Sequence, residues 1–425
     1  MSARNATTTV TAAQPGEQAI SEIHALIRDG LDREESGQKP WPSDSFWAGL
    51  RSLGSQLWLD TGDMEGASKL WTKELSGLTT NNTLLNAEVQ KGIYDDVIRK
   101  AAKVLQSVAP ETRVLEIAWI LNARHGLRLA RRFGGKVSVE LHTALADDVE
   151  GAVAYGRRFM KICPEQFIVK VPLTAAGLIA TRRLREENVP VNFTLGFSAR
   201  HNYLAASFAR PSYVNVFLGR LGAYFADNKL GDGKMIGEKA TLASQRFVKE
   251  LSRGQKEPTL QIAASLRGAS QVADLAGVDV FTLPLKVAEE AKKNLDGKWK
   301  SRLGEVYPVA LAQGVDQRSV RWETLWDVGA PEKKLAEAIT ARPPATGDEL
   351  VRVAESCGAR DLFPHLSPAD LERIGKDGKI PKHDAWKDRI QGGELAVDTL
   401  LNLAGLASFT HDQNALDDRI RRFIA

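Results

Sequence analysis

Gln-Phe-Ile-Val-Lys-Val-Pro-Leu-Thr-Ala-Ala-Gly-Leu, at residues 166–178, contains one lysine, Lys170, inside an apolar run. The run is rich in β-branched residues and ends at Pro172, which predicts a buried strand. A buried ammonium group without a partner is costly, or it loses its proton. Lys170 therefore either extends to solvent at the end of the strand or works as a neutral amine.

Seven further apolar segments accompany this one along the chain, and helical patterns separate most of them. The predicted strands are Gln56–Asp60, Ser76–Asn81, Lys136–Leu141, Pro190–Leu195, Tyr213–Leu218, Thr259–Leu266 and Val278–Leu285, with the Lys170 strand fourth in chain order. A long helical stretch is expected from Leu85 to Val108, with more helix to Phe133. Alternating strands and helices predict the α/β class, and eight such units close into a (β/α)8 TIM barrel.

The sequence predicts additions at both ends of the barrel. The expected parts are an N-terminal extension at 1–54, partly mobile and partly helical, the catalytic barrel at 55–299, a helical insertion at 300–393, and a C-terminal helix packed on the barrel at 394–425. Helices are expected over Gln18–Asp32 and Ser43–Leu53. The insertion has too much apolar surface for a disordered linker, so it is expected to pack on the barrel.

The composition is that of a globular protein that does not bind nucleic acid. Of 425 residues, 43% are hydrophobic, and 57 basic and 53 acidic residues are well mixed, with no basic block. No apolar run is long enough to span a membrane, and the N-terminus lacks the plan of a signal peptide, so a cytoplasmic protein is expected. The only cysteines, Cys163 and Cys357, lack the spacing of a metal site or a disulfide scaffold.

Polar side chains recur at or near the carboxyl ends of the predicted strands. They are Asp60, Asn81, Glu140, Lys170, Asn192, Thr194, Asn215, Arg220, Ser265 and Arg267. In a TIM barrel these ends meet at one mouth, where active sites lie. One such residue alone has a structural explanation, as Asp60 would as a helix cap. A contribution from seven strands at once indicates a catalytic site.

The types of side chain in this set indicate a reaction. A lysine amine attacks a carbonyl group, and the resulting iminium draws electrons from the neighbouring carbon–carbon bond. One carboxylate removes a hydroxyl proton, and another acts through water in forming and hydrolysing the imine. Arginine suits a phosphate group because its forked donors match the phosphate oxygens. The set therefore indicates imine chemistry on a phosphorylated carbonyl compound.

The same segments resemble transaldolases, Schiff-base transferases of the pentose phosphate pathway. The matching stretches are Leu-Asp-Thr-Gly-Asp at 59–63, Leu-Thr-Thr-Asn at 78–81, Val-Ser-Val-Glu at 137–140, Ile-Val-Lys-Val-Pro at 168–172, Val-Asn-Phe-Thr-Leu at 191–195, Phe-Leu-Gly-Arg at 217–220, Ala-Ser-Leu-Arg at 264–267 and Leu-Ala-Val-Asp at 395–398. The resemblance implies transfer of dihydroxyacetone from fructose 6-phosphate or sedoheptulose 7-phosphate to erythrose 4-phosphate or glyceraldehyde 3-phosphate. It implies no metal and no organic cofactor.

The resemblance also implies a role for each matching residue. Lys170 would form the imine, and Asp60 would be the acid and base for carbon–carbon cleavage. Glu140 and Thr194 would hold and activate the water. The substrate-binding residues would be Asn81 and Asn192 for the donor hydroxyls, and Arg220, Ser265 and Arg267 for the phosphate.

Three features depart from the family pattern. Asn82 replaces a common proline, which would loosen that loop. Asn215 replaces a common serine, and this bulkier group is expected to alter how the donor's first hydroxyl is bound. Residues 300–393 are longer than the family needs. These departures bear on specificity more than on the reaction.

Phe217 bears on the choice between two reactions. Transferases of the family have phenylalanine at this position, whereas the related fructose-6-phosphate aldolases have a tyrosine whose hydroxyl helps to protonate the carbanion. Transfer is therefore favoured over release of dihydroxyacetone to water. A catalytically silent barrel that only binds partners is the remaining alternative, and the complete set of Lys170, Asp60 and Glu140 speaks against it. The sequence leaves a homodimer open.

Overall fold

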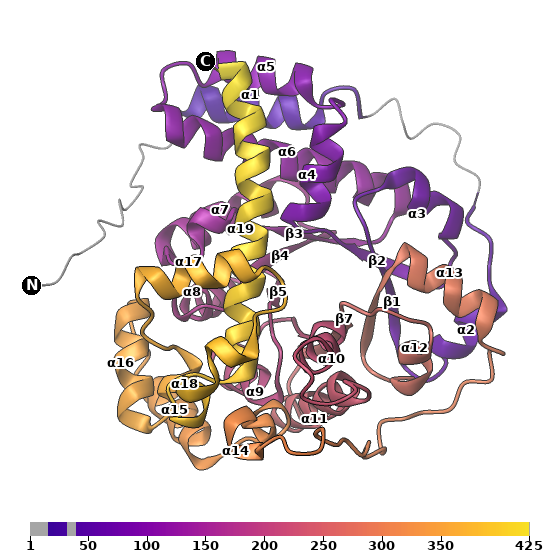
Figure 1. The fold of residues 1–425 in the computed structure, drawn as a ribbon. Helices are drawn as coiled ribbons and strands as arrows, with labels where there is room; N and C mark the ends of the chain where they lie inside the picture. The colour runs from indigo at the N-terminus through magenta and orange to yellow at the C-terminus, as the bar shows by residue number, and fades with distance from the viewer. Residues whose placement is uncertain (1–15, 32–39, 425) are drawn as a thin grey trace, which may run out of the picture.

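The computed structural model describes residues 16–31 and 40–424. Eight parallel strands pair in chain order and close into a barrel (Figure 1). They are β1 (Gln56–Asp60), β2 (Leu75–Thr79), β3 (Lys136–Glu140), β4 (Phe167–Pro172), β5 (Val191–Thr194), β6 (Tyr213–Phe217), β7 (Leu260–Ala264) and β8 (Val280–Pro284). The predicted (β/α)8 fold is confirmed. Asn81 lies beyond β2, because it caps the next helix instead of extending the strand.

The helices around the barrel follow the strands in turn. They are α3 (Met64–Leu70), α4 (Asn82–Gln90), α5 (Asp95–Val104), α6 (Pro110–Phe133), the 3-10 helix η2 (Thr143–Leu145), α7 (Val149–Ile162), α8 (Ala175–Glu186), α9 (Ala199–Phe208), α10 (Leu218–Asp227), α11 (Ile236–Leu251), α12 (Ser270–Asp274) and α13 (Leu285–Asn294). The helical stretch expected from Leu85 to Val108 is present as two helices, α4 and α5, and the further helix expected to Phe133 is α6. Gly92 adopts a left-handed φ of 82°, and Pro110 starts α6.

Side chains fill the barrel beneath the carboxyl ends of the strands. Trp58 of β1 is fully buried, and its ring lies 4.8 Å from that of Tyr213 in β6, centroid to centroid. A Cβ on Gly77 would lie 3.0 Å from the Trp58 ring, so glycine makes room for the indole. The barrel therefore has a packed core, and its open space lies at the carboxyl ends.

Two helices precede the barrel, namely α1 (Glu17–Arg28) and α2 (Ser45–Arg51). Both predicted helices are therefore present, with shorter bounds. Arg124 of α6 fixes the end of α1, since its Nη1 donates to the carbonyl oxygen of Leu26 at 2.9 Å. The predicted mobile start, at residues 1–15, and the predicted helical end at Asp32 lie outside the described residues.

After β8 and α13 the chain forms a series of helices outside the barrel. They are α14 (Gln317–Val320), η3 (Trp322–Leu325), α15 (Ala330–Ala341), α16 (Gly347–Cys357), η4 (Arg360–Leu362), α17 (Pro368–Asp377), η5 (His383–Ala385), α18 (Lys387–Gln391) and α19 (Val397–Ile424). α15 packs on α9, α16 on α8, and α17 on α19. Figure 1 shows α19, in yellow, crossing the barrel towards α5. Within the described ranges, no helix is both long and apolar enough to cross a membrane.

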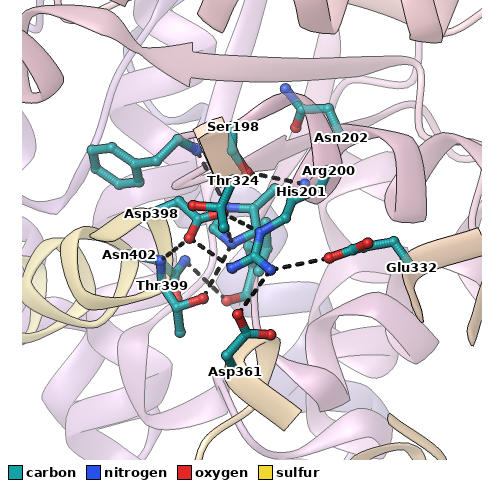
Figure 2. Close-up of polar contacts among 12 residues, drawn as sticks. Ser198, Arg200, His201, Asn202, Thr324, Glu332, Asp361, Asp398, Thr399 and Asn402 are labelled. Atoms are coloured by element: carbon teal, nitrogen blue, oxygen red, sulfur yellow. Dashed lines mark hydrogen bonds and ion pairs between the residues drawn. The ribbon is translucent and has the colours of Figure 1, made fainter. Parts of the chain in front are cut away.

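A buried group of charges, the Arg200 cluster, joins α9 to the added helices (Figure 2). The cluster comprises Arg200, Glu332, Asp361 and Asp398. Arg200 Nε lies 2.7 Å from an oxygen of Asp398, and Nη1 lies 3.1 Å from Glu332 and 3.0 Å from Asp361. Burial alone would raise the pKa of Asp398, but Arg200 and His201 reverse that effect and hold it well below its usual range. The cluster thus connects α9, α15, η4 and α19 through the ion pairs of Arg200.

Candidate active site

A cavity of about 200 Å³ opens at the carboxyl ends of the strands. Most of the predicted site residues line it, namely Asp60, Asn81, Lys170, Asn192, Thr194, Asn215, Phe217, Arg220 and Ser265. Glu140 and Arg267 do not line it. The structure adds lining residues that the sequence did not indicate, namely Thr79, Thr83, Leu84, Ile262, Ala264, Thr282, Lys379 and Phe409.

Lys170 is buried at the base of the cavity. Its side chain does not extend to solvent, because the residue is only 4% exposed. Nζ donates to the carbonyl oxygen of Thr80 at 3.0 Å and lies 3.5 Å from Glu140 Oε2. The Phe409 ring of α19 covers it, with its centroid 5.5 Å from Nζ. The amine is thus held beside a carboxylate under an apolar cover.

Glu140 lies beside Lys170, because the strand register pairs these two residues on the neighbouring strands β3 and β4. The backbone N–H of Asn82 donates to Glu140 Oε2 at 3.2 Å. Burial raises the pKa of Glu140, although Lys170 and the Asn82 N–H act in the opposite direction. Asn82 is itself fully buried, and a proline at this position would have no N–H to offer. A carboxyl with a raised pKa is suited to both give and take a proton.

Asp60 lies at the end of β1, in register with Thr79 of β2. Thr79 Oγ1 donates to Asp60 Oδ1 at 2.7 Å and lies 2.6 Å from the hydroxyl of Thr282 in β8. Burial raises the pKa of Asp60, and Lys170 partly offsets this. Thr79 belongs to the Leu-Thr-Thr-Asn stretch that resembles transaldolases, whereas only a position towards the carboxyl end of β8 marks Thr282 in the sequence.

Amide and hydroxyl groups form another part of the wall. Asn215 Nδ2 donates to Asn192 Oδ1 at 3.2 Å, and Asn192 Nδ2 donates to Ser138 Oγ at 3.0 Å. Asn215 Oδ1 accepts from the N–H of Gly196 at 3.2 Å, so the amide is fixed in place. Thr194 is fully buried, and its hydroxyl has no hydrogen-bond partner in the described part of the chain. That hydroxyl is available to a water molecule or a substrate.

Arg220, near the start of α10, supplies a buried positive charge. It is 7% exposed, and its Nη1 has no hydrogen-bond partner among residues 16–31 and 40–424. Burial and the nearby Arg267 lower the pKa of Arg220 to about 10. Arg267 is exposed, and its side chain passes so close to Gly219 that a Cβ there would lie 2.8 Å from Arg267 Cγ. Ser265 has a left-handed φ of 61°, which turns the chain at this point.

Two segments outside the barrel complete the cavity. Phe409 comes from α19, and Lys379 comes from the loop between α17 and η5. Thr83 Oγ1 donates to Asp412, which joins α4 to α19 beside the cavity. In the described ranges, no three His, Cys, Asp or Glu side chains come together in a way that could hold a metal ion.

The geometry places an amine, two carboxyl groups and a guanidinium at one barrel mouth. Residues 57–340 match the family described as Transaldolase/Fructose-6-phosphate aldolase. The chain belongs to this transaldolase family. It is therefore an enzyme of the transaldolase family.

Three similar transaldolases are between 27% and 35% identical to this chain over the aligned residues. A probable transaldolase of Thermus thermophilus is 35% identical over 243 residues, which cover 56% of this chain and 91% of the relative. A transaldolase of Rhizobium rhizogenes is 27% identical over 291 residues, 66% of this chain and 88% of the relative. A transaldolase of Xanthomonas euvesicatoria is 28% identical over 257 residues, 58% of this chain and 78% of the relative.

Proposed function

We propose that this protein transfers a dihydroxyacetone unit from a ketose phosphate to an aldose phosphate through a Schiff base at Lys170. The donors are fructose 6-phosphate or sedoheptulose 7-phosphate, and the acceptors are erythrose 4-phosphate or glyceraldehyde 3-phosphate. One observation supports this most directly. Lys170 Nζ is buried, lies 3.5 Å from Glu140, and faces a cavity that also contains Asp60 and Arg220.

Imine formation begins when the neutral amine of Lys170 attacks the C2 carbonyl of the donor. The carbonyl oxygen, after taking up protons, leaves as water and an iminium remains. Glu140 supplies and later recovers protons in these steps, in keeping with its raised pKa and its place beside Nζ. The unpartnered hydroxyl of Thr194 would bind the water molecule.

Cleavage follows because the iminium accepts the electron pair of the C3–C4 bond. Asp60 takes the proton of the C4 hydroxyl, C4 becomes an aldehyde carbon, and the shortened aldose phosphate leaves. The three-carbon enamine remains on Lys170. Addition to the acceptor aldehyde reverses these steps, with Asp60 returning the proton, and hydrolysis frees the product. The raised pKa of Asp60 suits a group that gives and takes one proton in each cycle.

The remaining polar residues bind the substrate in this proposal. The amides of Asn81, Asn192 and Asn215 face the donor hydroxyls. Arg220 receives the phosphate, since a buried guanidinium with an unpartnered Nη1 is a strong donor to an anion. Ser265 and Arg267 lie on the next strand end and add donors to the same group.

Transfer is preferred over hydrolytic release because of Phe217. Its ring lines the cavity and lies 5.2 Å from the Arg220 guanidinium. A phenyl ring has no hydroxyl with which to protonate the enamine, so the enamine persists until an acceptor arrives. An aldolase would require another proton donor at that position.

A coupled assay with fructose 6-phosphate, run with and without erythrose 4-phosphate, tests this function. We expect glyceraldehyde 3-phosphate to form in repeated turnovers only when the acceptor is present. Release of free dihydroxyacetone at a similar rate without the acceptor would identify an aldolase. Absence of any product in both assays would identify a silent barrel.

We also assign the reaction to the pentose phosphate pathway in the cytoplasm. The buried free thiols of Cys163 and Cys357 support a reducing compartment. Fractionation of the source cells, with activity measured in each fraction, checks this assignment, and activity confined to a membrane or secreted fraction would contradict it.

A further inference from the structure

Lys379 reaches the catalytic cavity from outside the barrel. It lies in the loop between α17 and η5, and it lines the cavity together with Arg220 and Phe409. The residue is exposed, whereas Lys170 at the base is buried. Lys379 therefore lies at the opening through which a substrate enters.

The loop that contains Lys379 is fixed to α10. Tyr224 Oη lies 2.8 Å from His383 Nδ1, and the N–H of His383 donates to Asn228 Oδ1 at 2.8 Å. Asn228 Nδ2 donates in turn to the carbonyl oxygen of Pro381 at 3.0 Å. α10 contains Arg220 near its start. The same helix thus also binds, near its C-terminal end, the loop that contains Lys379.

Two positively charged side chains of the cavity, Arg220 and Lys379, have no anionic partner among the described residues. Arg220 is more than nine-tenths buried, and its Nη1 has no hydrogen-bond partner among the described residues. Within residues 16–31 and 40–424, Lys379 forms no ion pair, whereas Lys376 on the same segment is paired with Glu372 at 2.6 Å. A buried guanidinium with an unpartnered N–H, such as that of Arg220, favours the binding of an anion. The unpaired ammonium of Lys379 at the opening of the cavity adds a second donor to that anion.

We propose that Lys379 is a specificity-determining residue that binds the substrate phosphate together with Arg220. This inference rests on the proposed transfer of sugar phosphates. Lysine has a flexible four-carbon stem, so its ammonium can follow a phosphate group at different distances from the reacting carbonyl. Arg220 fixes one side of the phosphate within the protein, and Lys379 closes over the other side at the opening.

The experiment compares Lys379→Ala and Lys379→Arg with Lys382→Ala. Lys382 is a matched control, because it is an exposed lysine of the same loop that does not line the cavity. For fructose 6-phosphate, Lys379→Ala should raise KM about tenfold and leave kcat within about twofold, because a lost phosphate contact acts on binding. Lys379→Arg should restore most of the affinity. Lys382→Ala should match the wild type.

Two further readouts complete the test. Weak turnover of unphosphorylated fructose should be the same in all variants, because it lacks the phosphate. Calorimetric binding of inorganic phosphate to the intact protein, which needs no turnover, should weaken in Lys379→Ala alone. Wild-type KM in Lys379→Ala, an equal loss on fructose, or an equal effect of Lys382→Ala would overturn the proposal.

The experiment distinguishes an error in the role of Lys379 from an error in the proposed transfer reaction. If the wild type turns over fructose 6-phosphate and Lys379→Ala binds it normally, only the role of Lys379 is lost. If the wild type has no activity but Lys379→Ala weakens phosphate binding, the anion site stands and the transfer reaction is wrong. Unchanged phosphate binding together with an inactive wild type rejects both.

Discussion

Asn82 shows how one backbone N–H influences the proposed acid and base. Its N–H donates to Glu140 Oε2, which stabilises the carboxylate and lowers the pKa that burial raises. Asn82 is the first residue of α4, a position where proline fits a helix well. Substitution by proline therefore removes the donor and leaves the helix intact.

Asn82→Pro should raise the pKa of Glu140, so the limb of the pH–rate profile that reports this carboxyl should move to higher pH. Asn82→Ala keeps the N–H and should leave the limb where it is. The measurement is kcat/KM for fructose 6-phosphate over the range from about pH 5 to about pH 9. Equal shifts in both variants, or no shift in a folded Asn82→Pro protein, would contradict this account of Glu140.

Asp60 and Glu140 should differ in the step that each controls. Asp60→Asn should still form the donor imine but turn over about 100-fold to 10,000-fold more slowly, because it lacks the base for cleavage. Glu140→Gln should form the imine slowly. Rapid mixing with donor, followed by reduction and mass measurement, separates the two steps. Imine formation at the wild-type rate in Glu140→Gln would show that the roles are misassigned.

The sequence indicates some site residues and conceals others for a physical reason. Lys170, Asp60 and Arg220 stand out because each lies at or near the end of an apolar strand, and the ends of parallel strands meet at one mouth. Phe409 and Lys379 come from segments that pack on the barrel from outside. No local pattern marks them, because their positions depend on tertiary packing of α19 and α17.

At the scale of elements, the Arg200 cluster should stabilise the attachment of α15, η4 and α19 to α9. Arg200→Met would leave Asp398, Asp361 and Glu332 buried without their shared cation. The expected loss in the free energy of unfolding is about 3–5 kcal/mol. Urea unfolding of the purified protein measures it.

Arg157→Met is the control for this prediction. Arg157 of α7 pairs with Glu187, but both side chains are well exposed, at 53% and 39%. Loss of this pair should change the free energy of unfolding by about 1 kcal/mol or less. Similar losses in the two variants would mean that the Arg200 cluster adds no more than an ordinary surface pair.

The bounds of a helix or strand were predictable where the spacing of its hydrophobic residues and the Gly or Pro residues that end it indicate the same limits. The strands around Lys170 follow from their β-branched runs, and all eight are present. The helical stretch predicted from Leu85 to Val108 follows from an apolar period that continues through Gly92. The structure breaks it there, since the chain must turn back to place α5 against α1 and α6.

At the scale of the whole molecule, the buried His125 should make the free energy of unfolding depend on pH. His125 of α6 is buried, and burial, aided by Arg128, lowers its pKa to about 4. An unfolded chain binds the proton near about pH 6.5. Between these values the unfolded state binds more protons, so the free energy of unfolding decreases as the pH falls from about 6.5 to about 4.

His125→Gln should remove this contribution. The free energy of unfolding should then fall less steeply across that range, by up to about 1.4 kcal/mol per pH unit. The exposed His411→Gln is the control and should leave the slope unchanged. Urea unfolding at several pH values gives the slopes. Parallel curves for the wild type and His125→Gln would contradict the buried, neutral state of this histidine.

Closure of the barrel was predictable from the sequence, because eight βα units have few other ways to bury both faces of a parallel sheet. The placement of α15 to α18 was not. Their apolar residues show that they pack on something, but the partner surfaces on α8, α9 and α19 are distant in the sequence. The contacts of Arg200 with three carboxylates are likewise visible only in three dimensions.

The central claim is that Lys170 forms a Schiff base with the donor, and reductive trapping tests it most directly. The protein is incubated with fructose 6-phosphate and borohydride, and the modified peptide is located by mass spectrometry. We expect a reduced three-carbon adduct on Lys170 and none on Lys379, with Lys170→Met unmodified. An adduct at another lysine, or none while activity is lost, would contradict the account.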